Sequence, residues 1–300
     1  MPFLQVAAFL IAVADFALGG LISNGFLVTM TVMEWAKCKR LSSTGQLLLS
    51  VGLSNICATV PVATVLIIEK SDFADNLLFQ IMFSFGISVI YFRFWLSAWL
   101  CVFYCIKIVN STWSFILWCK QRISWLIPRL LVGSLLVSFL LSPFSDYTMP
   151  MHSRWSNVTG TITNGTQGKT EIDDLSSFRL LFLVTGNVCP FVVVLLCTIL
   201  SVASLCRHLH HMTGGESGFQ SFQTKAHIKA IGTLVSLLFL YILLHLAQTL
   251  PFAEILKVEI VPFFAKVMSI LYSPVQAVIL VLANPKLKCA AIQILKRTQI

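Results

Sequence analysis

Seven long apolar stretches constrain this chain more than any other feature of its sequence. A helix crosses about 30 Å of hydrocarbon with about 20 mostly apolar residues, because each residue rises about 1.5 Å. Hydrophobic residues make up 57% of the chain and charged residues only 11%, whereas a soluble domain carries about 25% charged residues. The sequence therefore predicts an all-α membrane protein, a seven-transmembrane helix bundle that forms a single domain over residues 1–300. The expected spans are roughly residues 6–33, 47–68, 77–109, 125–144, 178–206, 230–252 and 260–283.

The connecting segments fall into two groups by charge. One group, with the C-terminal tail 284–300, carries 13 Lys and Arg against two acids, and the other carries five against nine. Loops rich in Lys and Arg face the cytoplasm, so we expect the N-terminus outside and the tail in the cytosol of a multi-pass plasma-membrane protein. The net charge of +9 is then a topology signal, and nucleic acid is not an expected partner.

This orientation makes residues 145–177 the second extracellular loop. The loop contains the glycosylation acceptors Asn157-Val-Thr and Asn164-Gly-Thr. Asn110-Ser-Thr also matches, but it falls on the cytosolic side and is expected to carry no glycan. The tail places Leu287, Ala291, Ile294 and Leu295 on one helical face, which predicts an amphipathic helix on the lipid of the inner leaflet.

No pattern in the sequence points to catalysis or to a bound cofactor. Neither a His-Glu-x-x-His motif, nor Gly-x-Ser-x-Gly, nor a P-loop is present. His208, His210 and His211 resemble a metal cluster but have no neighbouring carboxylate or thiolate pair, so we interpret them as a solvated basic helix end. We expect no enzyme, no cofactor and no metal. All nine cysteines lie in spans or on the cytosolic side, so no disulfide framework is expected.

Six different short motifs follow one another along nearly the whole chain. They are Asn24-Gly25, Leu41-Ser42 with Leu47-Leu48, Val102-Phe103-Tyr104 with Lys107-Ile108-Val109-Asn110, Ile127-Pro128-Arg129, Ser204-Leu205 with His208 and Met212, and Asn284-Pro285-Lys286-Leu287-Lys288. This set resembles the type 2 (bitter) taste receptors, a branch of the G-protein-coupled receptors. The resemblance implies a chemosensory receptor that detects small bitter compounds in the outer half of the bundle. It also implies activation of a heterotrimeric G protein, gustducin-like or of a related inhibitory class, and it leaves a receptor dimer open.

The chain departs from the family at five positions. Asn55 replaces the usual Arg of helix two, and Ser273-Pro274 replaces His-Ser in helix seven. Gly86 and Ile90 replace a pocket Trp and an Asn of helix three. The ligand contacts of other members therefore do not carry over to this chain.

The residues themselves nominate a ligand site. Polar side chains two to four turns below the outer face are costly against lipid, so we expect them to face the interior. Each is equally well explained by a hydrogen bond to a neighbouring helix. The polar candidates are Tyr91, Asn187, Tyr241, His245, Gln248 and Lys266, and the candidates for the wall are Phe83, Gly86, Ile87, Ile90, Phe94 and Phe263.

Charged and polar residues inside the spans are expected to be structural. Asp15 and Lys266 lie at similar depth in the first and last spans, and we expect them to pair because an unpaired charge is costly there. Arg93 is expected to bond Asn55 or backbone carbonyls. Asn24, Pro190 and Pro274 complete the structural set.

A second set of residues lies at the cytosolic ends of the spans. We expect them to surround the G protein, although a role in topology and lipid contact explains their charge as well. They are Phe103, Tyr104, Lys107, Arg207, His208, His227 and Lys229.

Three other functions remain as alternatives. A different chemosensory receptor, such as a pheromone receptor, is the nearest alternative. The motifs of the third and fifth spans, Val102-Phe103-Tyr104 with Lys107 and Ser204-Leu205 with His208, argue against it. A transporter is expected to show an internal repeat, which an odd number of spans without a visible repeat opposes. A channel needs a selectivity element, and none is visible in the sequence.

Overall fold

The computed structural model describes residues 3–68, 77–109, 114–141, 184–212, 218–249 and 260–298. Within these ranges the regular elements are all helical. They are α1 (Phe3–Cys38), α2 (Ser43–Ile68), α3 (Leu77–Ile108), α4 (Ser114–Leu141), the π-helix η2 (Val184–Val188), α8 (Cys189–Met212), α9 (Gly218–Thr249), α10 (Ile260–Ala283) and α11 (Pro285–Thr298). The loop 145–177 with Asn157 and Asn164, and Asn110, lie outside the described residues.

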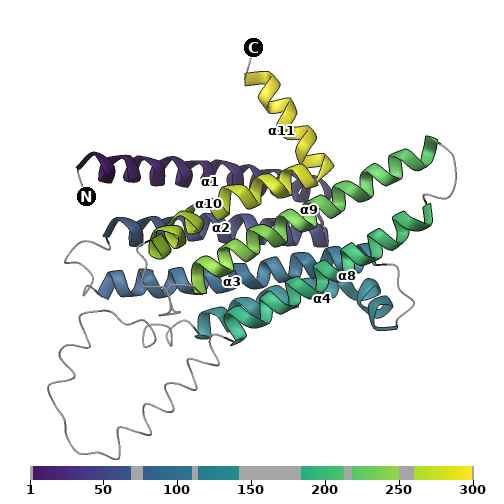
Figure 1. The fold of residues 1–300 in the computed structure, drawn as a ribbon, viewed down its shortest axis with the longest axis horizontal. Coiled ribbons are helices and arrows are strands. Elements are labelled where there is room, and N and C mark those ends of the chain that lie inside the picture. Colours follow the sequence, from purple (N-terminus) through teal and green to yellow (C-terminus); the bar gives the residue numbers. More distant parts are fainter. Residues whose placement is uncertain are drawn as a thin grey trace, which may run out of the picture.

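The long helices run side by side as one bundle (Figure 1). α1 packs against α2 and α10, and α9 packs against α8 and α10. α3 is the central helix, since it contacts α2, α4, η2, α8 and α9. Among the described residues, five helices are long and apolar enough to cross a membrane, and α10 with α11 forms a sixth candidate bent by 105°.

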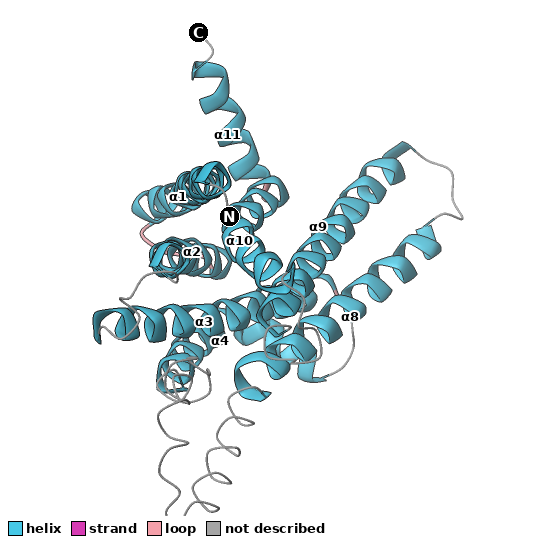
Figure 2. Cartoon of the chain, turned by 60° about the vertical axis from the view of Figure 1, so that its left-hand side comes forward, coloured by secondary structure: helices cyan, strands magenta, loops and turns pink. Residues whose placement is uncertain are grey.

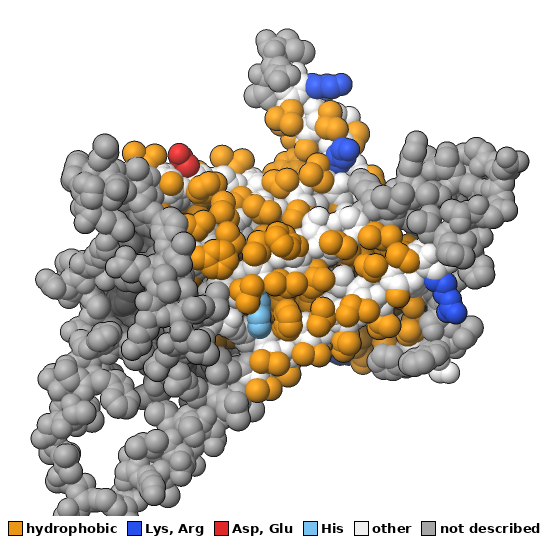
Figure 3. Space-filling model, in the orientation of Figure 1, with side chains coloured by type: hydrophobic (Ala, Val, Ile, Leu, Met, Phe, Trp, Pro, Cys, Tyr) orange, Lys and Arg blue, Asp and Glu red, His pale blue; other side chains and the backbone are white. Residues whose placement is uncertain are grey.

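Apolar side chains cover the outside of the bundle. Ile22 on α1, Leu140 on α4 and Phe239 on α9 are 73%, 70% and 62% exposed. In Figure 3 apolar side chains spread over the middle of the visible face, whereas the Lys and Arg side chains lie on α11 and at one end of the bundle. Such a surface requires lipid as its solvent.

The ends of the helices follow local capping rules. The Ser42 hydroxyl accepts the Gly45 N–H at 3.1 Å and so caps α2. The Asn284 carboxamide oxygen accepts the Lys286 N–H at 3.1 Å, and Pro285 occupies the first position of α11. The Asn-Pro pair therefore ends α10 and starts a new helix, which points away from the bundle in Figure 2.

Two helices, α9 and α4, extend furthest beyond the expected spans on the cytosolic side. α9 begins at Gly218 and α4 at Ser114, whereas the expected spans begin near residues 230 and 125. The additional turns contain polar and basic residues such as Gln121 and Arg122. The bundle thus continues as helix below the hydrocarbon, since helical hydrogen bonding does not depend on lipid.

The core consists of two apolar clusters joined along α3. The cytosolic cluster includes Leu47, Leu100 and Phe103. The other cluster is rich in aromatic residues and includes Phe94 and Tyr241. The second cluster provides the scaffold of the candidate ligand site.

Candidate functional site

Five aromatic rings from three helices meet in the outer half of the bundle. The Phe191 ring stacks on the His245 imidazole with centroids 4.5 Å apart and planes inclined by 15°. Phe94 lies edge-on to Tyr241 at 5.5 Å and to His245 at 6.2 Å. We call this set the outer aromatic cluster: Tyr91 and Phe94 of α3, Phe191 of α8, and Tyr241 and His245 of α9.

The π-helix at the start of α8 positions one wall of this cluster. Such single-turn π segments shift the register of the following residues and often occur at functional sites. A Cβ on Gly186 would lie 2.5 Å from Cδ1 of Tyr91. Any larger residue at this position would therefore require the Tyr91 ring to move. The same turn directs Asn187 inward, where it is 4% exposed.

Three polar atoms of η2 and α9 beside the cluster have no hydrogen-bond partner among the described residues. They are Oδ1 of Asn187, the hydroxyl of Tyr241 and Nδ1 of His245. A buried polar atom without a partner is costly, and in a native protein it calls for an explanation. The arrangement presents hydrogen-bonding atoms between apolar ring faces, which suits a small molecule with a flat apolar body and a few polar groups.

The other residues that we expected to line the site lie in different surroundings, and only some of them face the cluster. Ile87 and Ile90 pack against the cluster. Gln248 instead donates to the Ser269 hydroxyl at 3.0 Å, so it joins α9 to α10. Gly86 is buried against α2, where an added Cβ would lie 3.2 Å from Cβ of Pro61. The side chains of Phe83, Phe263 and Lys266 lie outside the described residues.

A chain of buried hydrogen bonds joins α1, α2, α3 and α10 at mid-depth. Asn55 donates to Oδ1 of Asn24 at 2.9 Å and to Oε1 of Gln276 at 3.0 Å. Gln276 in turn donates to the Tyr272 hydroxyl at 2.9 Å. We call the following set the central polar network: Asn24, Asn55, Arg93, Ser97, Tyr272, Ser273 and Gln276.

Arg93 reaches this network from α3 and is only 3% exposed. Its guanidinium donates to the Ser273 hydroxyl at 3.1 Å and lies 4.5 Å from the centre of the Tyr272 ring. The side-chain partner of Arg93 is therefore Ser273, whereas we expected Asn55 or backbone carbonyls; the Asn55 amide instead donates to Asn24 and Gln276. The described residues include no carboxylate that forms an ion pair with Arg93.

Asp15 is exposed on α1. Because the side chain of Lys266 is outside the described residues, the Asp15–Lys266 pair stays a prediction. Pro190 is buried near the start of α8 and Pro274 lies inside α10.

At the cytosolic end of α3, the motif residues Phe103, Tyr104 and Lys107 differ in how deeply they are buried. Phe103 is buried in the core, whereas Lys107 is exposed and lies 4.4 Å from the Phe103 ring centre. Lys107 also donates to the Thr44 hydroxyl of α2 at 3.4 Å. Tyr104 is half-buried beside Phe103. Arg207 is exposed, and the side chains of His208, His227 and Lys229 lie outside the described residues.

An ion pair fixes the start of α11. Nζ of Lys286 lies 2.8 Å from a carboxylate oxygen of Glu34 at the end of α1. The hydrogen bond and the charge of Glu34 raise the pKa of Lys286 above its usual value. The tail is thereby tied to α1 where it leaves the bundle.

Comparison with known proteins places this arrangement in a family. The sequence model of the family "Taste receptor protein (TAS2R)" matches residues 1–299. The chain belongs to the type 2 taste receptor family. It is a seven-helix chemosensory G-protein-coupled receptor of the plasma membrane, not an enzyme, and family membership implies small-molecule ligands and coupling to a G protein.

Individual relatives cover most of the receptor. Taste receptor type 2 member 124 of Rattus norvegicus is 31% identical over 291 residues, 96% of this chain and 92% of the relative. Member 39 of Macaca mulatta is 32% identical over 80% of this chain and 72% of its own length. Member 40 of Gallus gallus is 32% identical over 79% and 77%.

Sequence reasoning missed two parts of the receptor site. Phe191 was not expected, although it follows Asn187 by four residues and therefore lies on the same helical face. Ser269 and Gln276 were also missed. With Ser273 they recur at intervals of three and four residues in an otherwise apolar helix, and this period indicates a polar face turned inward.

Proposed function

We propose that the receptor binds uncharged bitter compounds with a flat apolar body at the outer aromatic cluster. The observation that carries this proposal is a group of polar atoms on Asn187, Tyr241 and His245, beside the stacked rings, that have no partner in the part of the chain that the structure describes. These atoms can accept from, and in the case of the hydroxyl also donate to, polar groups of a ligand.

The charge of the site argues for uncharged ligands. The described residues of the outer aromatic cluster are Tyr, Phe and His, and none of these has a carboxylate that would bind a cation. Among the described residues the only buried charge is that of Arg93, and it already interacts with Ser273 and the Tyr272 ring. A site of rings and aliphatic side chains adapts to several ligand shapes with modest affinity.

We further propose that the cytosolic end contacts a gustducin-like or related inhibitory G protein. Lys107 and Arg207 are exposed there, and Tyr104 is half-buried. The exposed Ile294 and Leu295 of α11 would rest on the lipid of the inner leaflet. A receptor dimer is compatible with this arrangement.

The experiment that tests the ligand site is a calcium response in transfected cells. The cells express the receptor with a promiscuous G protein and are exposed to a panel of bitter compounds. We expect His245→Ala and Asn187→Ala to raise the half-maximal concentration of an agonist about tenfold at normal surface expression. That factor corresponds to about 1.4 kcal/mol, the scale of one hydrogen bond with its apolar contact.

Phe239→Ala is the matched control. Phe239 lies on the same helix as His245 but is 62% exposed on the outside of the bundle. Its loss should leave agonist potency within about twofold. Equal effects of the Phe239 and His245 variants would contradict this location of the site. Replacing the G-protein α subunit by an inhibitory-class chimaera then tests the coupling class separately.

A further inference from the structure

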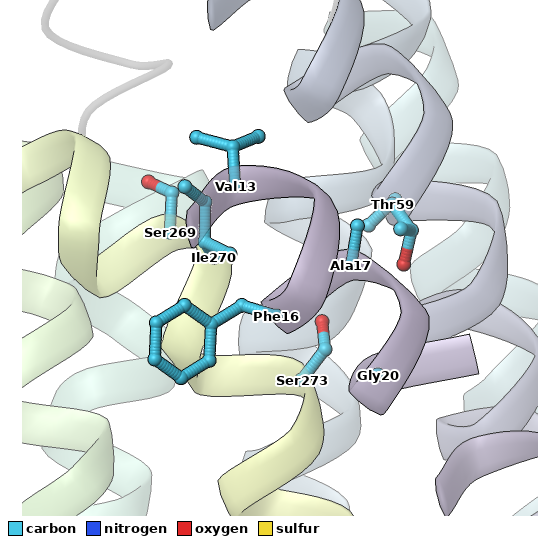
Figure 4. A pocket seen from close by; sticks show the side chains of 9 residues that line it. Val13, Phe16, Ala17, Gly20, Thr59, Ser269, Ile270 and Ser273 are labelled. Carbon is cyan, nitrogen blue, oxygen red and sulfur yellow. The ribbon is translucent and has the colours of Figure 1, made fainter. Parts of the chain in front are cut away.

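A crevice and a pair of arginines interrupt the apolar outside of the bundle. The crevice lies between α1, α2 and α10, where Gly20 faces Ser273 (Figure 4). It has room for about one water molecule, so it holds no larger ligand. The arginines, Arg122 and Arg129, are exposed on α4, and their surroundings point to a ligand.

The two arginines lie on the side of α4 that turns away from the other helices. With two tryptophans they recur at intervals of three and four residues, so the four side chains share one helical face. Val132 and Leu136, both 57% exposed, continue this face into the hydrocarbon. Ile127, on the opposite side of α4, is buried in the cytosolic core cluster. We call the four residues the tryptophan–arginine stripe: Trp118, Arg122, Trp125 and Arg129.

Each arginine of the stripe lies over the tryptophan one turn nearer the cytosol. Cζ of Arg129 is 3.3 Å from the centre of the Trp125 ring, and Cζ of Arg122 is 5.9 Å from that of Trp118. Arg129 also donates to the Trp125 carbonyl at 3.4 Å. This bond uses one of the five N–H groups of a guanidinium. The stripe therefore presents two oriented cations that can still donate to an anion.

No carboxylate in the described part of the chain neutralises these arginines. That part contains two acidic residues, Asp15 and Glu34, both on α1. Glu34 pairs with Lys286, whereas α4 packs against α2 and α3. A charge that faces lipid without a counter-ion is costly. The stripe therefore calls for an anion that comes from the membrane itself.

The two charges lie at different depths. Arg122 and Arg129 are seven residues apart, which is about 10 Å along a helix. The expected span of α4 begins near residue 125, and the Arg129 guanidinium bends back over Trp125 to that level. It therefore lies at the edge of the hydrocarbon, where lipid phosphodiesters lie. Arg122 lies about 10 Å further out, at the depth of a large head group.

We propose that the tryptophan–arginine stripe binds a phosphoinositide, an inner-leaflet phospholipid with further phosphates on its head group. Arg129 binds the phosphodiester and Arg122 binds a head-group phosphate, since guanidinium groups match phosphate oxygens in pairs. The acyl chains lie along Val132 and Leu136. The tryptophan rings hold the guanidinium planes in place, so less freedom is lost on binding. A lipid with a single phosphate reaches only one of the two arginines.

The probe for the experiment is phosphatidylinositol bisphosphate with a photoreactive diazirine in one acyl chain. The full-length receptor is placed in phosphatidylcholine nanodiscs with increasing amounts of probe, irradiated and analysed by peptide mass spectrometry. We expect saturable labelling of the α4 segment that contains Val132 and Leu136. Unlabelled phosphatidylinositol bisphosphate should compete for this labelling, phosphatidylserine should compete weakly, and soluble inositol trisphosphate, which has no acyl chains, should not compete at equal concentration.

Charge-removing variants test the two arginines separately. For Arg122→Gln and for Arg129→Gln we expect half-maximal labelling of α4 to need about fivefold more probe, the upper range for one exposed ion pair. Arg129→Lys keeps the charge but loses the planar group that stacks on Trp125, so we expect a smaller loss of about threefold. This variant also keeps the test valid if a glutamine variant fails to fold.

Lys120→Gln is the matched control. Lys120 is also exposed on α4, but it precedes Arg122 by two residues and so lies on the opposite side of the helix. Its loss removes the same charge and should change half-maximal labelling by less than about twofold. Equal effects of the Lys120 and Arg122 variants would overturn the proposal, because net charge alone would then explain binding. Equal competition by phosphatidylserine or by inositol trisphosphate, or saturable labelling without α4, would overturn it too.

Discussion

Replacing Asn55 by leucine is the sharpest test of the central polar network. Asn55 is fully buried and donates two hydrogen bonds, at 2.9 Å to Asn24 and at 3.0 Å to Gln276. Leucine has the same number of side-chain heavy atoms and the same branching but no donor, so the substitution removes the two bonds and leaves two acceptors without partners. Interhelical hydrogen bonds in membranes contribute about 0.6 kcal/mol each on average, and at most about 1.7. We therefore expect Asn55→Leu to lower the free energy of unfolding by about 1–3 kcal/mol.

The measurement is thermal unfolding of purified receptor followed with a thiol-reactive dye. Cys101 and Cys105 are buried and react only after unfolding, whereas exposed cysteines such as Cys38 give a constant background. Taking about 2–4 °C per kcal/mol, as for soluble domains of 150–250 residues, the midpoint should fall by about 2–12 °C. Leu53→Ala is the control on the same helix, since Leu53 is 46% exposed, and it should change the midpoint by less than about 2 °C.

A double-mutant cycle decides whether the bonds themselves are responsible. Gln276→Met removes the acceptor of Asn55, so the two substitutions share one lost bond. The combined loss should then be smaller than the sum of the single losses by about 0.5 kcal/mol or more. Strictly additive losses, or an Asn55→Leu midpoint equal to that of Leu53→Ala, would refute the assigned network.

Two further predictions concern the outer half of the receptor. Gly186→Ala would place a methyl group 2.5 Å from the Tyr91 ring, so the ring must move; we expect agonist potency to fall about tenfold at normal surface expression, and unchanged potency would show that the ring does not shape the site. We also expect glycans on Asn157 and Asn164 and none on Asn110, measured as gel shifts of single Asn→Gln variants after glycosidase treatment, and a glycan on Asn110 would reverse the orientation.

The sequence alone determined the class of protein and much of its local structure. The apolar stretches require lipid, because no soluble core could cover that much apolar surface. The Lys and Arg distribution predicts the orientation, and the Asn284-Pro285 pair marks the end of one helix and the start of another. These conclusions follow from local composition and capping, which depend on neighbouring residues only.

Only the tertiary structure decided which polar residues meet. Arg93 and Ser273 are 180 residues apart, and nothing in the sequence relates them until the folded bundle brings the Arg93 side chain from α3 to α10. The sequence instead suggested Asn55 or backbone carbonyls as partners, because depth in the membrane can be read from the chain whereas the rotation of each helix about its axis cannot. That rotation depends on close contacts such as Gly186 against Tyr91, and it determines which side chains face the ligand, the lipid or each other.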